Sequence, residues 1–161
     1  MTKIEIEFPD SQIVIRAQLE EVKAPVTTES IKKILSTGPV ETVGRHAMYT
    51  GKEISVQFSE DRCNGSGLTG DVKENLTCFP QPGDLLFTYM PAYAWGGVPS
   101  QIFDIGIFYG KDARTFFPMG WLPGNLFATV VPEDLEKLAE LGSKVHLNGQ
   151  QHLIIREIQK S

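Results

Sequence analysis

The pair Arg45 and His46 carries the side chains best suited to chemistry in this sequence. A permanent cation disfavours a second positive charge beside it, so His46 is a candidate base or hydrogen-bond acceptor. The Arg45 guanidinium could bind a carboxylate or a carbonyl group of a ligand. The alternative is an ordinary pair of surface residues at the start of a strand.

Hydrolysis would require a nucleophile, a base and a group that orients the base. The sequence offers Ser55, Ser66, Ser100 and Cys78 as nucleophiles, but none lies in a nucleophile-elbow motif. A small-molecule hydrolase or isomerase that uses Arg45 and His46 is therefore an alternative function, and the sequence defines no catalytic residue.

The two cysteines, Cys63 and Cys78, form neither a disulfide framework nor a metal-ligand pattern. We expect two separate thiols in a reducing compartment, the alternative being one pair that closes the Gly-rich loop between them. No cysteine or histidine pair lies nearby at zinc-ligand spacing, so the sequence predicts no metal and no cofactor.

A loop rich in aromatic residues, proline and glycine separates two β-like runs within residues 82–110. Tyr93 and Trp95 are flanked there by Ala, Gly and Pro, which offer few neighbours to bury them. We expect these rings to cover a pocket or to form a subunit interface. A homo-oligomer, most simply a symmetric dimer, is the predicted assembly.

The composition limits the class of protein and its partners. The chain has 161 residues, with 41% hydrophobic and 22% charged residues, as expected for one soluble globular domain. A formal net charge of −5 disfavours nucleic acid as a partner. The N-terminal residues contain no apolar signal segment, and no apolar run approaches the roughly 20 residues of a membrane span. We expect a cytoplasmic protein without membrane contact.

Apolar residues that alternate with polar ones predict most of the chain to be β structure. Proline starts and glycine stops predict two helices, near residues 25–37 and 133–141. Polar, Gly-rich residues 59–75 predict a surface excursion. The predicted strands and turns are a hairpin over 4–19, two strands over 40–58, strands before and after the aromatic loop, β structure over 116–130 with a turn at 123–125, and a closing hairpin over 145–155 around Asn148-Gly149.

Two helices separated by a long block of β structure suggest a barrel capped at both ends. Three segments also resemble cyclophilins, in cyclophilin order: PVTTESIKKILSTG at 25–38, SQIF at 100–103 and WLPG at 121–124. The resemblance implies a mainly β fold, a cyclophilin-like β-barrel capped by two helices. The length predicts a single domain over residues 1–161, and we expect the helix and hairpin of residues 132–158 to pack on the barrel.

Other segments resemble more closely a family of cyclophilin-like proteins known as DUF3830. They are His46-Ala47, PGDLL at 82–86, FYG at 108–110 and GNLFA at 124–128. This resemblance covers nearly the whole chain. It implies the same barrel and leaves the activity open.

Peptidyl-prolyl isomerase activity is a further alternative. A cyclophilin-type isomerase places an Arg beside the prolyl nitrogen, within a Phe-His-Arg-Ile stretch. Here residues 44–47 read GRHA, with the order reversed and no preceding Phe, and the glycine-containing cyclophilin strand is replaced by residues 52–58. Gln101 and Trp121 match residues that wall the cyclophilin pocket.

We therefore predict a protein that binds a small molecule or short peptide in a cleft beside the barrel. Arg45 would anchor a polar group, while aromatic rings would supply apolar area. The predicted ligand-binding residues are Arg45, His46, Glu53, Tyr93, Trp95, Gln101 and Trp121.

Overall fold

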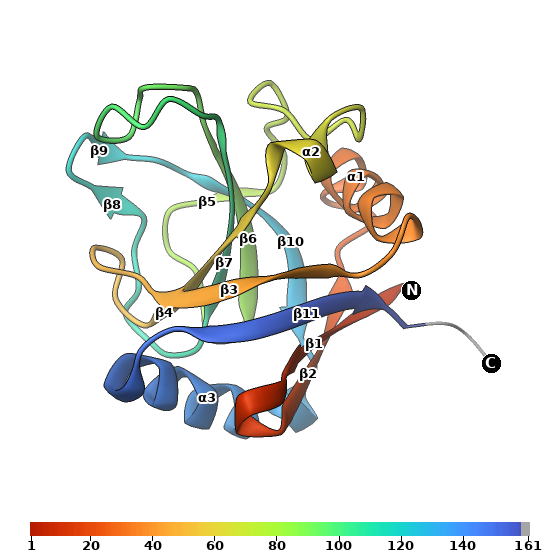
Figure 1. Ribbon diagram of the computed structural model, residues 1–161, viewed down its shortest axis with the longest axis vertical. Coiled ribbons are helices and arrows are strands. Elements are labelled where there is room, and N and C mark those ends of the chain that lie inside the picture. The colour runs from red at the N-terminus through yellow and green to blue at the C-terminus, as the bar shows by residue number, and fades with distance from the viewer. Residues whose placement is uncertain (159–161) are drawn as a thin grey trace.

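The computed structural model describes residues 1–158, which form a closed antiparallel β-barrel of eight strands (Figure 1). The barrel strands are β1 (Lys3–Phe8), β2 (Ile13–Leu19), β3 (Val40–His46), β4 (Glu53–Phe58), β6 (Asp84–Met90), β7 (Ile102–Phe108), β10 (Gly124–Val130) and β11 (Gln151–Glu157). Their spatial order is β2-β1-β11-β3-β4-β7-β6-β10, and β10 pairs back with β2 to close the ring. The predicted mainly β barrel is confirmed.

Short elements complete the chain. They are η1 (Pro9–Ser11), α1 (Pro25–Ser36), α2 (Glu60–Cys63), β5 (Leu76–Thr77), β8 (Phe116–Phe117), β9 (Gly120–Trp121), η2 (Pro132–Asp134) and α3 (Leu135–Asn148). No helix within residues 1–158 is long and apolar enough to cross a membrane.

Each barrel strand uses its two-residue period to fill the interior with one face. In β4 the side chains of Ile54, Val56 and Phe58 are buried inside the barrel. The alternate residues, Glu53, Ser55 and Gln57, lie on the opposite face of the sheet. The same alternation that builds the core thus places a row of polar side chains on the outside of the barrel.

The two longer helices pack on the barrel with apolar stripes. Helix α1 buries Ile31, Ile34 and Leu35, and α3 buries Leu138, Leu141 and Val145. In Figure 1, α3 runs below the strands and α1 lies at the upper right. The two predicted helices are therefore present, although α3 is longer than its predicted range.

The predicted closing hairpin over 145–155 is wrong. Residues 145–148 belong to α3, because Val145 continues the apolar stripe of Leu138 and Leu141 at helical spacing. Gly149, with φ of 97°, ends the helix, and its N–H donates to the Val145 carbonyl. Strand β11 pairs with β1 and β3 instead of with its own preceding residues.

Two smaller expectations also differ. The predicted turn at 123–125 is absent, because Gly124 and Asn125 already pair with Thr77 and Leu76 of β5. The predicted surface excursion of residues 59–75 contains α2 and buries Cys63 and Leu68 in the main core. The two cysteine thiols are free, as expected.

Gly142 of α3 lets the ring of Tyr109 pack directly on the helix backbone, since a Cβ at this position would collide with that ring. Alanine favours a helix by about 1 kcal/mol over glycine, but overpacking costs typically ~1–3 kcal/mol. We expect Gly142→Ala to lower the free energy of unfolding in urea denaturation. Ser143→Ala, at the exposed neighbouring position, is the control, and a Gly142→Ala protein as stable as this control would contradict the packing argument.

Candidate functional site

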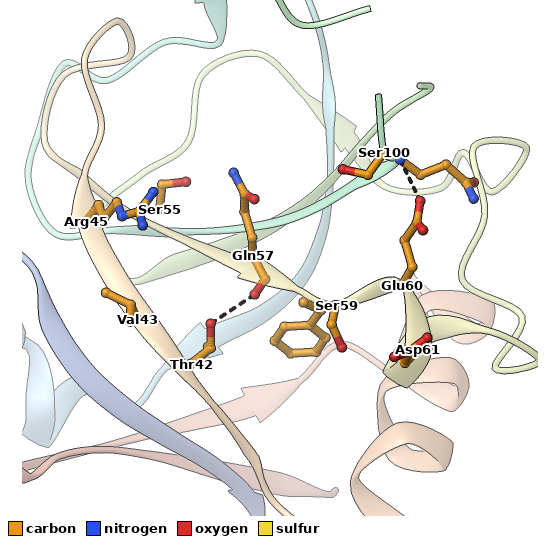
Figure 2. Close-up of a pocket in the computed structure, with 11 residues that line it drawn as sticks. Thr42, Val43, Arg45, Ser55, Gln57, Ser59, Glu60, Asp61 and Ser100 are labelled. Carbon is orange, nitrogen blue, oxygen red and sulfur yellow. Dashed lines mark hydrogen bonds between the residues drawn. The ribbon is translucent and has the colours of Figure 1, made fainter. Parts of the chain in front are cut away.

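Two adjoining hollows lie on the outer face of the barrel, where β3, β4 and β7 run side by side. The first, the carboxyl pocket, has a volume of about 230 Å³ and is lined by acidic and apolar side chains. The second, the polar groove, has a volume of about 500 Å³ and is drawn in Figure 2. Arg45, Ser55 and Gln57 line both, so the hollows form the two ends of one cleft.

Glu53 begins β4 and lines the carboxyl pocket. Its side chain is only 5% exposed, and Thr50 Oγ1 donates a hydrogen bond to its Oε1. The carboxyl group crosses over Gly106 of β7, where any Cβ would collide with Oε2. Gly106 therefore provides the space that the buried Glu53 carboxyl occupies.

Asp104 lies on the same outer face, two residues before Gly106 on β7. It stands opposite Gln57 in the strand pairing, while Ser55 stands opposite Gly106. Ser55 Oγ donates to Asp104 Oδ1 over 2.6 Å. Strand register thus brings two carboxyl groups from distant parts of the sequence into one pocket.

The pKa values of both carboxyl groups are raised. Burial, and then the charge of Asp104, raise the pKa of Glu53 to about 8. Burial raises the pKa of Asp104 above its usual range as well, although the Ser55 hydrogen bond opposes this. Within residues 1–158, neither carboxylate forms an ion pair with a lysine, arginine or histidine.

His46 lines the carboxyl pocket, but both of its ring nitrogens have protein partners. Nδ1 lies 2.8 Å from the Ala47 carbonyl oxygen, which can only accept, so Nδ1 carries a proton. In the neutral ring, Nε2 then accepts from the Tyr109 hydroxyl over 2.6 Å. The arrangement orients the ring and leaves no free nitrogen lone pair for the proposed role of base.

Arg45 lies near the end of β3, not at the start of a strand as predicted. Its Nε donates to Gln150 Oε1 over 3.0 Å, just before β11. The side chain lines both hollows, which leaves it at their junction. Part of the guanidinium is thus already engaged by the protein.

The aromatic residues separate into two groups. Trp95 lines the carboxyl pocket and makes edge contacts with Tyr49 and Phe117, at ring-centroid distances of 5.7 and 5.8 Å. Trp121 is 52% exposed, lies beside Phe116 at 4.9 Å and lines neither hollow.

The remaining two predicted residues are also divided. Gln101 lines the polar groove, where its Oε1 accepts from the Tyr89 hydroxyl. Tyr93 is 69% exposed, has φ of 68° and lines neither hollow. The structure therefore brings Arg45, His46, Glu53 and Trp95 together, adds Gln101 at the other end of the cleft, and leaves Tyr93 and Trp121 outside it.

Residues 6–155 match the family described as "Protein of unknown function (DUF3830)". The chain belongs to this family. No curated protein matches the DUF3830 chain.

Solved structures share its fold. The structure of McbB in complex with tryptophan is 21% identical, with a TM-score of 0.68, and the match covers 98% of this chain and 45% of McbB. The chain thus spans less than half the length of McbB.

Two cyclophilins also match. The Mimivirus cyclophilin is 11% identical, with a TM-score of 0.58, and the match covers 99% of this chain and 90% of that protein. A cyclophilin-type peptidyl-prolyl cis-trans isomerase of Cryptosporidium parvum, solved in the presence of the dipeptide Ala-Pro, is 13% identical, with a TM-score of 0.53 and 99% coverage of both chains. At these identities the likeness concerns the fold alone, and it confirms the predicted cyclophilin-like barrel.

Sequence reasoning missed Asp104 and Thr50 as members of the site. Residues 102–108 read IFDIGIF, an apolar strand interrupted only by Asp104 and Gly106. An acid and a glycine two positions apart lie on one face of a strand, which is the signal that could have been used. The partner of that face could not be read from the sequence, because it depends on pairing with β4.

The buried Glu53 carboxyl makes stability depend on pH. Its ordinary pKa is 4.5 and the folded value is about 8, so between these values the folded protein holds a proton that the unfolded chain releases. The free energy of unfolding therefore decreases as the pH rises from about 5 to about 8. We expect Glu53→Gln to remove most of this decrease and to be about 1–3 kcal/mol more stable than the wild type at pH 8.

Urea denaturation at pH 5 and pH 8 measures this effect. Glu140→Gln, on the exposed face of α3, is the matched control and should follow the wild type. Parallel pH dependences for Glu53→Gln and the wild type would show that Glu53 is ionised in both folded and unfolded states.

Proposed function

We propose that this DUF3830 protein binds a small molecule or short peptide in the cleft formed by the carboxyl pocket and the polar groove. The observation that carries the proposal is that Arg45, Ser55 and Gln57 line both hollows. They join the carboxyl pocket, which is mostly apolar with two acidic groups, to the polar groove. Ligand sites combine apolar area with a few convergent polar groups in this way.

The polar groove offers hydrogen-bonding groups suited to an extended ligand. In Figure 2 the Gln57 side chain stands between Ser55 and Ser100. The Gln101 backbone N–H donates to Glu60 Oε1 over 2.6 Å, which fixes the start of β7 against α2. Such groups support the binding of a peptide or of a polar tail that leaves the carboxyl pocket.

The matched structures supply first ligands to test. McbB was solved with tryptophan, and the Cryptosporidium parvum cyclophilin in the presence of Ala-Pro. We therefore include free tryptophan, Ala-Pro and tryptophan-containing dipeptides in a metabolite library.

Filling the junction of the cleft should abolish binding. Ser55→Tyr places a ring where the two hollows meet, whereas Ser143→Tyr adds the same ring in a separate hollow beside α3. In a thermal-shift screen, a ligand at 100 times its dissociation constant adds about 2.7 kcal/mol to stability. We expect hits with the wild type and Ser143→Tyr but not with Ser55→Tyr, and hits that bind Ser55→Tyr equally well would contradict the location.

Prolyl isomerase activity is the weaker alternative for this cleft. A directed hydrogen bond to the prolyl amide must lower a barrier of ~18–20 kcal/mol. Here Arg45 is engaged with Gln150, and Trp121 lies outside the cleft. We expect no acceleration of an Ala-Pro peptide above the buffer rate in a protease-coupled assay. Acceleration that disappears in Arg45→Ala would establish the isomerase instead.

A further inference from the structure

We propose that the ligand of the cleft is an aromatic primary amine whose ammonium group binds between Glu53 and Asp104. This inference rests on the proposed function, and it specifies the chemical class of the ligand.

Glu53 is buried and Asp104 half-buried, and their partners differ from those of the two other buried acids, Asp134 and Asp84. Asp134 is fully buried, and Arg16 binds both of its oxygens over 3.0 and 3.1 Å. Asp84 accepts the backbone N–H of Gln81 over 2.8 Å and holds a turn. Each of these acids has a charged or backbone partner.

Glu53 and Asp104 receive only neutral hydroxyl donors, from Thr50 and Ser55. Burying a charge without an opposite charge is costly, and removing one partner of a buried pair leaves the other uncompensated. The described residues contain no cation paired with either group. A bound cation would therefore stabilise the ionised forms of both carboxyl groups.

An organic ammonium fits this site better than a metal ion. An ammonium group needs about three hydrogen-bond acceptors, whereas calcium takes about six to eight oxygen ligands. Nowhere in residues 1–158 do three or more acidic, histidine or cysteine side chains assemble as metal ligands. The two carboxyl groups and their hydroxyl neighbours match the smaller requirement.

The apolar walls define the rest of the ligand. Tyr49, Trp95 and Phe117 lie in contact along the carboxyl pocket, with Met90 and Ile102 beside them. Aromatic faces attract cations and pack against aromatic rings. A volume of about 230 Å³ is below the ~300–1,000 Å³ of drug-sized sites, so the pocket suits one aromatic ring system with its amine.

Arg45 would orient the bound ligand. Its charge at the junction repels a second cation there and favours a carboxylate or carbonyl group. An amino acid or the N-terminal residue of a peptide would place its amine on Glu53 and Asp104 and its carbonyl towards Arg45. The remaining chain would then follow the polar groove.

Binding of an ammonium should depend on pH. The titratable and charged groups that line the pocket are Arg45, His46, Tyr49, Glu53 and Asp104. An ammonium binds the ionised form of Glu53, and burial beside Asp104 raises the pKa of Glu53 in the free protein. Affinity should therefore increase as the pH rises from 6 to 8, with release of a proton.

Three indoles of similar shape test the proposal by isothermal titration calorimetry at pH 6 and pH 8. They are tryptamine, a cation; 3-indolepropionate, an anion; and N-acetyltryptamine, which is neutral. We expect tryptamine to bind at pH 8 at least tenfold more tightly than either of the others, and severalfold more tightly than at pH 6. Glu53→Gln and Asp104→Asn should each weaken tryptamine at least tenfold, while Glu140→Gln should not.

Each outcome decides the proposal. If Glu53→Gln binds N-acetyltryptamine as well as or better than the wild type does, its pocket is intact. Its weaker binding of tryptamine is then due to the missing negative charge, which supports the proposal. If the wild type binds the anion or the neutral indole as tightly as tryptamine or more tightly, the cation proposal is overturned. The proposal that the cleft binds a ligand is then unaffected. Absence of binding by all three indoles also overturns the cation proposal. The proposed function fails as well only if the metabolite library contains no ligand whose binding is abolished by Ser55→Tyr.

Discussion

The two-residue period of paired strands is the constraint on which this protein depends. On β4 and β7 the inward side chains fill the barrel, and the outward ones form the wall of the cleft. Neither face can change alone, because a slip of one residue would turn Glu53 inward and Ile54 outward. Closure of the barrel through β10 and β2 fixes the register of every strand, and with it the geometry of the site.

A second constraint is the space that glycine leaves on a crowded sheet. Gly106 allows the Glu53 carboxyl to lie flat across β7, and Gly142 allows Tyr109 to pack against α3. Tyr109 in turn orients His46 at the rim of the cleft. The docking of α3 and the shape of the cleft are therefore connected through one tyrosine ring.

The cleft of this protein departs from the site that the resemblance to cyclophilins implies. Of the two residues that match cyclophilin pocket walls, Gln101 lines the polar groove together with Arg45, whereas Trp121 lines neither hollow. The carboxyl pocket instead contains an acidic pair, Glu53 of β4 and Asp104 of β7. Placing a buried Glu53 beside a half-buried Asp104 costs free energy that the surrounding core of the barrel offsets, and such exceptions concentrate at functional sites.

By itself the sequence determined the strand alternation, the starts of both helices and the family-specific segments. It also indicated seven ligand-binding residues, of which Arg45, His46, Glu53 and Trp95 line the carboxyl pocket and Gln101 lines the polar groove, while Tyr93 and Trp121 line neither hollow. Tertiary structure alone decided the partner of Glu53, since Asp104 is distant in the chain and meets it only through the β4–β7 register. It also decided the end of α3, where an apolar stripe through Val145 outweighed the Asn148-Gly149 turn signal. Local patterns specify which face a side chain occupies, whereas closure of the barrel specifies what that face meets.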